Sequence, residues 1–266
     1  MESSLKKTRA QFVMLERFYD STEKEIYELS IDEAGRGCLF GRVYVACVVL
    51  PKDPSLFSGK DIKDSKKFSS KKKLNEVAEY IKTNALAWHV SYVDEKTIDD
   101  INILQSVMKG MHECIRETMN KICKKTSCSP SINNFMAVID GNCFTPYIMF
   151  DKITESLQQM KHVTIEQGDA KYMAIAAASI LAKTTRDAYV IEMCEKYPEL
   201  SRRYGLDKNM GYGTKTHLTG IQEHGISQWH RKTFGNTCKM AVLNEISEEP
   251  TEEPLQESLQ EQLIQI

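Results

Sequence analysis

Four acidic residues lie at the predicted end of a strand or the predicted start of a helix. Asp32 and Glu33 close the apparent strand "EIYELSID" and are followed at once by "AGRGCLFG". Asp140 ends the apolar run "FMAVID", and Asp169 precedes the long apolar stretch "MAIAAASILAKTTRD". Such positions can meet at one edge of a sheet. Clustered carboxylates with no histidine nearby suit Mg²⁺ or Mn²⁺ better than zinc.

Each acid also has a simpler interpretation. Asp140 can begin an Asp-Gly turn, Asp169 can cap a helix, and Asp32 and Glu33 can cap the amides of a tight hairpin. Four such coincidences in a chain with a basic body favour a site.

The glycines that follow Asp32 resemble a nucleotide-binding loop only in part. They fall at positions 35, 37 and 41, which gives G-x-G-x-x-x-G, one residue too long for the dinucleotide fingerprint. A strand, "RVYVACVVL", follows where a helix should begin, and two acids stand where a pyrophosphate would approach. Glycines here can instead let a ligand come close to the backbone.

The elements that must position these residues follow from hydrophobic periodicity. Strands are predicted at 25–32, 42–50, 85–93, 135–140 and 162–167, because apolar residues alternate or run continuously there. Helices are predicted at 69–82, 97–125 and 146–160. We expect a five-stranded mixed sheet with helices on its faces.

After Asp169 the chain is predicted to be almost wholly helical, with 201–217 as a glycine-rich loop. A helical stripe is expected to form a core face; its members are Met173, Ala176, Ala177, Ile180, Leu181 and Thr184. We favour a structural role for Asp187. His217, His224 and His230 lack the spacing of a zinc site.

Charge is divided unevenly along the 266 residues. The overall charge of −2 splits into −7 in residues 245–266 and +5 in residues 1–244. Residues 60–73 alone hold seven lysines against two aspartates, which suits either nucleic acid or an ordinary solvated face. The acidic tail lacks the apolar residues to fold alone and is predicted to be disordered.

Cysteine usage and the termini indicate an intracellular protein. The eight cysteines show no C-x-x-C spacing, which favours reduced thiols over zinc ligands or disulfides. The N-terminus lacks the apolar run of a signal peptide, and no stretch is long enough to cross a bilayer. We therefore expect a soluble, cytoplasmic protein without a membrane partner.

From about Glu25 to Phe234 the chain resembles type 2 ribonuclease H, also called ribonuclease HII. The resemblance rests on "DEAGRG", "DSKKFSSKKK", "IDGN", "GDAKYMAIAAASILAKTTRD", "GYGTKTH" and "HRKTF". The last two motifs resemble the bacterial branch more than the archaeal or eukaryotic one. Residues 1–20, the polar insertion 123–134 and the acidic tail depart from the family pattern.

The resemblance implies a role for each matching residue. Asp32, Glu33, Asp140 and Asp169 match the family's catalytic metal ligands. Gly35, Arg36 and Gly37 match the motif that contacts the backbone around a ribonucleotide, and Tyr212 matches the tyrosine that stacks on the neighbouring sugar. Beside these, we consider four lysines as phosphate contacts, although a solvated surface role fits each equally well; they are Lys66, Lys67, Lys183 and Lys215.

The resemblance also implies a fold and an activity. We expect a ribonuclease H-like α/β domain over 25–240 with a helical C-terminal part, preceded by an extension (1–24) and followed by a tail (241–266). It would use two Mg²⁺ or Mn²⁺ ions to hydrolyse the RNA strand of RNA·DNA hybrids and to nick DNA at embedded ribonucleotides, leaving 5′-phosphates.

The alternative is a catalytically silent nucleic-acid-binding protein of the same fold. A role in DNA replication and repair and a monomeric state are further expectations. "QEQLIQI" at the C-terminus is only distantly similar to peptides that dock on sliding clamps, because it lacks their aromatic anchors.

Overall fold

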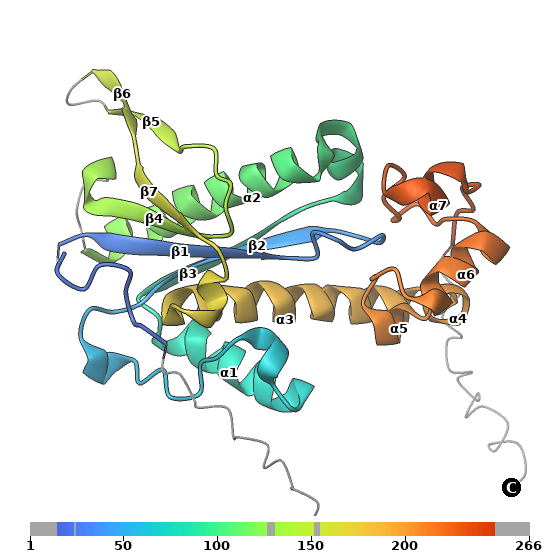
Figure 1. Cartoon of the computed structure of the whole chain (residues 1–266), viewed down its shortest axis with the longest axis horizontal. Helices are drawn as coiled ribbons and strands as arrows, with labels where there is room; N and C mark the ends of the chain where they lie inside the picture. The colour runs from blue at the N-terminus through green and yellow to red at the C-terminus, as the bar shows by residue number, and fades with distance from the viewer. Residues whose placement is uncertain (1–14, 24, 127–130, 152–154, 248–266) are drawn as a thin grey trace, which may run out of the picture.

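A five-stranded mixed sheet forms the centre of the molecule (Figure 1). The computed structural model describes residues 15–23, 25–126, 131–151 and 155–247. The strands follow the order β3-β2-β1-β4-β7 and all five lie where the sequence predicts them. β1 is antiparallel to β2, and parallel to β4. Their bounds are Tyr27–Ala34 (β1), Val43–Val49 (β2), Ala87–Val93 (β3), Phe135–Asp140 (β4) and Lys161–Ile165 (β7).

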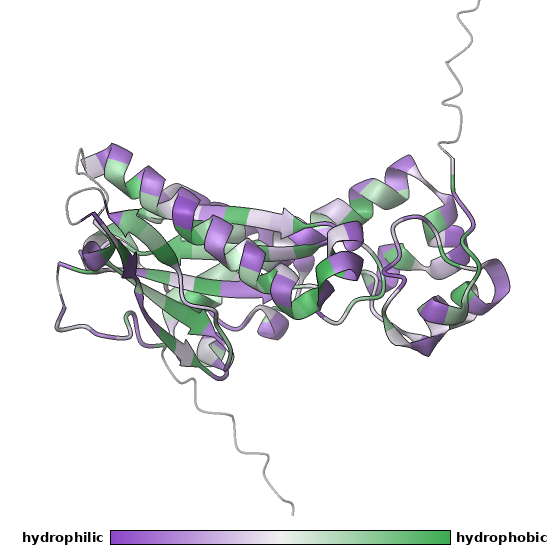
Figure 2. Ribbon diagram, turned by 90° about the horizontal axis from the view of Figure 1, so that it is seen from above, coloured by the Kyte–Doolittle hydropathy of each residue, from purple (hydrophilic) through white to green (hydrophobic). Residues whose placement is uncertain are grey.

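Long helices cover both faces of this sheet. α2 (Glu95–Thr126), interrupted at Asn102, lies on one face, and α1 (Lys71–Asn84) and α3 (Met173–Lys196) lie on the other (Figure 1). Apolar residues concentrate on the strands, while the outer helix faces carry hydrophilic ones (Figure 2). The mixed sheet with flanking helices is thus confirmed.

Alternation along the strands creates two separate cores. Leu29 and Ile31 of β1 pack with α2, whereas Ala46 and Val48 of β2 pack with α1 and α3. On α3 the predicted stripe does form a core face: Ala176, Ala177, Ile180 and Leu181 are fully buried, and Met173 and Thr184 are half-buried at its ends. The small alanines let α3 approach the sheet closely.

The helix predicted over 146–160 is wrong. This segment forms a two-stranded hairpin, β5 (Ile148–Asp151) and β6 (Ser156–Gln159), that projects from the sheet (Figure 1). Ile148, Phe150 and Leu157 are exposed, so their spacing did not mark a helix face packed on a core.

Among the described residues, four short helices follow α3 and cluster near its C-terminal end (Figure 1). They are α4 (Glu199–Tyr204), α5 (Leu206–Asn209), α6 (Lys215–His224) and α7 (Gly235–Met240). The glycine-rich loop predicted over 201–217 is therefore wrong for most of its length, and only Gly205 and residues 210–214 lie between helices there. Gly205, with a φ of 63°, ends α4 and allows α5 to begin at once.

The chain contains four isolated 3₁₀ turns among the described residues. They are η1 (Pro54–Leu56), η2 (Ser65–Lys67), η3 (Ile132–Asn134) and η4 (Gly168–Ala170). Two of them, η2 and η4, carry residues of the predicted site.

Both ends of the described part lie against the fold. Glu16 pairs with Tyr172, and Ile246 is buried against the C-terminal helices. The division into extension, domain and tail stays a prediction, since 1–14 and 248–266 lie outside the described residues.

Within the described ranges, no helix combines the length and apolarity needed to span a membrane. As expected for reduced thiols, Cys38, Cys47 and Cys114 are free and buried.

Candidate active site

Asp32 and Asp140 are brought together by the register of two parallel strands. β1 pairs with β4 so that Ile31 lies opposite Ile139, and the next residue of each strand is an aspartate. Because Leu29 and Ile31 point toward α2, the alternation of a strand directs Asp32 to the opposite face, under α3. Asp32 is only 6% exposed there.

Asp169 joins these carboxylates through the η4 turn. The Gly168 amide donates a hydrogen bond of 2.6 Å to Asp140 Oδ1, which fixes the turn against the end of β4. The space for a Cβ at Gly168 is occupied by Ile175 and by Asp140 Oδ1, so the close approach requires glycine. Asp169, the next residue, is 8% exposed.

One cavity of about 370 Å³ collects these acids and most other predicted site residues. It is lined by all four acids and by Gly35, Arg36, Gly37, Lys66, Lys183 and Tyr212. Lys67 and Lys215, by contrast, are not part of its lining. Of the four lysines considered as phosphate contacts, Lys66 and Lys183 therefore line the cavity of the acids, whereas Lys67 and Lys215 do not.

Asp32, Glu33 and Asp140 resist ionisation in this cavity. Burial raises the pKa of Asp32 well above its usual range, and the neighbouring Asp140 and Glu33 carboxylates raise it further. Burial also raises the pKa of Glu33, opposed by Arg36. Burial and the charge of Asp169 raise the pKa of Asp140, although the hydrogen bond from Gly168 lowers it. Such a cluster gains stability from a cation placed among its oxygens.

Protein cations face two of the four acids. Arg36 Nη1 lies 3.3 Å from Glu33 Oε1, and Lys66 Nζ lies 3.7 Å from Asp169 Oδ2. No group of three or more His, Cys, Asp or Glu side chains within the described ranges is gathered tightly enough to form a preformed ion site. The donors nevertheless fit Mg²⁺ or Mn²⁺ by their chemistry, since they are hard carboxylate oxygens that repel one another.

The two glycines of the turn after Glu33 have different surroundings. Gly35 has a φ of +91°, and a Cβ built on it would lie 2.1 Å from Arg186 Nε. Gly37 would place a Cβ in open space, with nothing within 4 Å. Packing within the protein thus already requires a glycine at position 35, whereas Gly37 leaves room beside the cavity.

Tyr212 presents its ring to the cavity from the loop between α5 and α6. The ring is 47% exposed, so a role as a buried core tyrosine is ruled out. The backbone of Tyr212 is held on both sides: its amide donates to Asn209 O at 3.0 Å, and its carbonyl lies 2.9 Å from His217 Nδ1. Arg186 lies over the ring, with Cζ 5.7 Å from the centroid.

Sequence reasoning missed several residues of the lining. Ser179 hydrogen-bonds Asp32 and lies 3.3 Å from Ser65 Oγ, which links α3 to η2. Gln167 and Arg186 complete the wall. Asp187, expected to be structural, also lines the cavity and pairs with Lys183 at 3.1 Å. A polar serine within an otherwise apolar helix was the one available signal.

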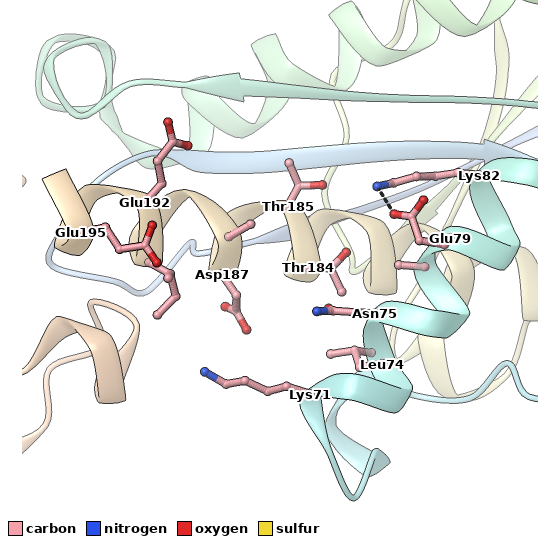
Figure 3. A pocket seen from close by; sticks show the side chains of 13 residues that line it. Lys71, Leu74, Asn75, Glu79, Lys82, Thr184, Thr185, Asp187, Glu192 and Glu195 are labelled. Atoms are coloured by element: carbon pink, nitrogen blue, oxygen red, sulfur yellow. Dashed lines mark hydrogen bonds and ion pairs between the residues drawn. The ribbon is translucent and has the colours of Figure 1, made fainter.

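A larger hollow of about 630 Å³ lies between α1 and α3 (Figure 3). Its lining carries four carboxylates against two lysines: Glu79, Asp187, Glu192 and Glu195 with Lys71 and Lys82. Lys82 is already paired with Glu79 at 2.7 Å. This excess of negative charge would repel a polyanion such as nucleic acid. The larger volume of this hollow therefore does not make it the candidate site.

Comparisons with known proteins identify the family of the chain. The family model "Ribonuclease HII" matches residues 29–237. The ribonuclease HII of Parabacteroides distasonis is 42% identical over 207 residues, covering 78% of this chain and 89% of its own. That of Bacteroides thetaiotaomicron is 40% identical over 211 residues, covering 79% and 90%. Both organisms are bacteria, as the closing motifs predict.

Solved structures show the same fold. Ribonuclease H2 from Pyrococcus horikoshii superposes with a TM-score of 0.57 at 20% identity, over 80% of this chain and 96% of its own. The ribonuclease HII of the PCNA complex from Archaeoglobus fulgidus gives 0.54 at 24% identity, over 79% and 96%. With its sequence motifs, its sheet and its relatives in agreement, the chain belongs to the ribonuclease HII family.

Proposed function

We propose that the protein is an endonuclease that hydrolyses the RNA strand of RNA·DNA hybrids and nicks duplex DNA at embedded ribonucleotides. The observation that carries this proposal is the single cavity in which four carboxylates face the Gly35–Gly37 turn and Tyr212. Family membership supports the general activity. The substrate range and the use of two metal ions rest on the cavity and its chemistry.

The four carboxylates would hold two divalent ions, Mg²⁺ or Mn²⁺. Such ions, when bound, activate water and stabilise the charge that develops during phosphodiester hydrolysis. Asp32 is fixed for this role by the end of β1 and by Ser179, and Asp140 by the Gly168 amide. Both anchors limit the motion of these two side chains.

Cations of the protein would hold the substrate backbone. Arg36, Lys66 and Lys183 surround the acids from three different elements, which lets them contact phosphates on either side of the cleaved bond. The open space at Gly37 allows a sugar edge to reach backbone amides, which can recognise a 2′-hydroxyl. The exposed ring of Tyr212 offers a surface on which the next sugar can stack.

The proposal is tested with a DNA duplex that contains one ribonucleotide and with a continuous RNA·DNA hybrid. Purified protein is incubated with each in Mg²⁺, in Mn²⁺ and in chelator. We expect cleavage with 5′-phosphate products in either metal and none in chelator. Tight binding of both duplexes without cleavage in either metal would favour the catalytically silent alternative.

The remaining expectations concern partners. A PCNA complex is known for the Archaeoglobus fulgidus protein. For this chain a clamp contact through the C-terminal tail stays a weak proposal, because residues 248–266 lie outside the described structure. A monomeric state and a cytoplasmic role in DNA replication and repair are likewise proposals.

A further inference from the structure

Arg186 on α3 is enclosed between two glycines from distant parts of the chain. Its side chain is 2% exposed. A Cβ on Gly35 would lie 2.1 Å from its Nε, and one on Gly211 would lie 3.2 Å from its Nη2. Both glycines have positive φ, +91° and +82°. The guanidinium therefore occupies a slot that exists only because two glycines border it.

The hydrogen bonds of Arg186 reach the side of Gly211, whereas Gly35 is met by packing of Nε and Cδ. Nη1 donates to Met210 O at 2.8 Å, just before Gly211, and Nη2 donates to Phe40 O at 3.4 Å. The backbone also joins the two segments on the far side, where Leu39 N donates to Gly211 O at 2.9 Å. Arg186 provides the link on the side of the cavity, which it helps to line.

The charge of Arg186 is poorly compensated. Its two hydrogen bonds go to neutral carbonyls, and the buried Nε has no hydrogen-bond partner. Burying a guanidinium in this way costs free energy that an apolar side chain of similar size would avoid. Structural stability alone therefore does not account for an arginine here.

We propose that Arg186 is a positioning residue that sets the distance between the Gly35–Gly37 turn and Tyr212. This inference rests on the proposed function, in which these two elements contact adjoining sugars. Arg186 is placed by α3. Its Nε and Cδ fill the space beside Gly35, its Nη1 donates to Met210 O, and the Tyr212 ring packs beneath its guanidinium. The residue thereby adjusts selectivity for a ribonucleotide joined to DNA without contacting the carboxylates.

The experiment compares R186K and R186M with wild type on the two duplexes of the activity assay. A lysine keeps the charge but lacks the planar fork, so both variants should lose positioning. We expect kcat/KM for the single ribonucleotide to fall about tenfold more than kcat/KM for the continuous hybrid, the size of effect of one lost charge-assisted contact. The loss for the hybrid should be the smaller of the two, because the four acids are held by other contacts.

R17M is the matched control. Arg17 also donates to backbone carbonyls, Phe57 O at 2.6 Å and Pro51 O at 2.8 Å, and its Nε is likewise buried without a partner, but it does not line the cavity. R17M should lower the melting temperature and leave the ratio of the two kcat/KM values unchanged. If the ratio of the two kcat/KM values in R186K equals that of wild type, the inference is overturned. This test holds even if R186M fails to fold. Absence of cleavage by wild type would instead refute the proposed function.

Discussion

His217 and His230 point their Nε2 atoms at each other across 3.0 Å in the interior of the C-terminal helices. The hydrogen-bond network assigns both tautomers. His217 Nδ1 faces the Tyr212 carbonyl at 2.9 Å and must donate, so its Nε2 accepts from His230. His230 Nδ1 then accepts from the Ser227 amide at 3.0 Å. Both rings are neutral, and the pair anchors the loop that carries Tyr212.

This pair predicts a loss of stability in mild acid. Burial and the neighbouring His217 lower the pKa of His230 to about 3, and burial lowers the pKa of His217. Below about pH 6.5 both histidines take up protons in the unfolded chain but stay neutral in the folded protein. The free energy of unfolding therefore falls as pH falls, by up to about 1.4 kcal/mol per pH unit for each histidine. Urea unfolding between pH 7.5 and 5 measures this slope.

H230Q should flatten that slope, whereas H224Q should not. His224 is exposed, with 42% of its side chain accessible, and serves as the control. The buried carboxylates, whose raised pKa values give a slope of the opposite sign, are present in both variants and cancel in the comparison. Equal slopes for wild type and H230Q would show that the folded protein protonates His230 as readily as the unfolded chain does.

Gly35 and Gly37 should respond differently to alanine. In G35A the new methyl group meets Arg186 and the backbone must keep a φ of +91°, so we expect a loss of about 2 kcal/mol or more in unfolding free energy. In G37A nothing within 4 Å opposes the methyl group. Its melting temperature should stay near wild type, while KM for the single-ribonucleotide duplex rises. A stable, fully active G37A would remove Gly37 from substrate recognition.

The acids and the sheet could be predicted because their information is local. Alternating apolar residues define β1 and β4, and acids at the ends of such strands share an edge in any sheet that pairs them. The hairpin at 148–159 could not be predicted, since its apolar residues face solvent and mimic a helical spacing. The short α4 and α5 were hidden because glycine-rich composition was taken as a sign of loop.

Arg186 illustrates what the sequence does not contain. Its neighbours on α3 are core alanines and a Lys183–Asp187 pair, so nothing nearby indicates that it reaches Gly35 and Met210. The contact depends on how α3 crosses the sheet and on where the C-terminal loop returns. For the same reason Gly35 could be interpreted only as room for a ligand, although its space is filled by the protein itself.

D140N should abolish turnover while the fold persists. The amide oxygen of asparagine can still accept the 2.6 Å hydrogen bond from Gly168, and one charge is removed from a repelling cluster. We therefore expect a melting temperature equal to or above wild type, with kcat reduced by about a hundredfold or more, as for removal of a preorganised electrostatic group. Near-normal kcat with an unchanged melting curve would exclude Asp140 from the site.

Divalent ions should stabilise the protein in the absence of substrate. A bound cation offsets the repulsion that raises the pKa of Asp32 and Asp140, and any ligand that binds only the folded state raises the melting temperature. Titration with Mg²⁺ at pH 8 should produce a saturable increase, which chelator reverses and D140N diminishes. The increase should shrink toward pH 5, where protons compete for the same oxygens. An equal increase in D140N would mean that the ions bind elsewhere.

Lys66 and Lys67 form a natural test of which lysines contact substrate. Lys66 lines the cavity with its Nζ 3.7 Å from Asp169, whereas Lys67 lies outside the lining. In K66Q, KM for both duplexes should rise. The slope of log KM against log salt concentration should become shallower by about the contribution of one phosphate contact, because fewer counterions are released on binding. K67Q should match wild type in both respects.

The pairing of Lys66 with Asp169 adds a second, opposite effect. Its ammonium group competes with divalent cations for the Asp169 carboxylate, so K66Q should reach half-maximal activity at a lower Mg²⁺ concentration even as its KM for substrate rises. Measuring activity against Mg²⁺ at saturating substrate separates the two effects. If K66Q and K67Q gave the same Mg²⁺ curve and the same salt slope, Lys66 would be an ordinary surface lysine and its ion pair with Asp169 would have no influence on the metal site.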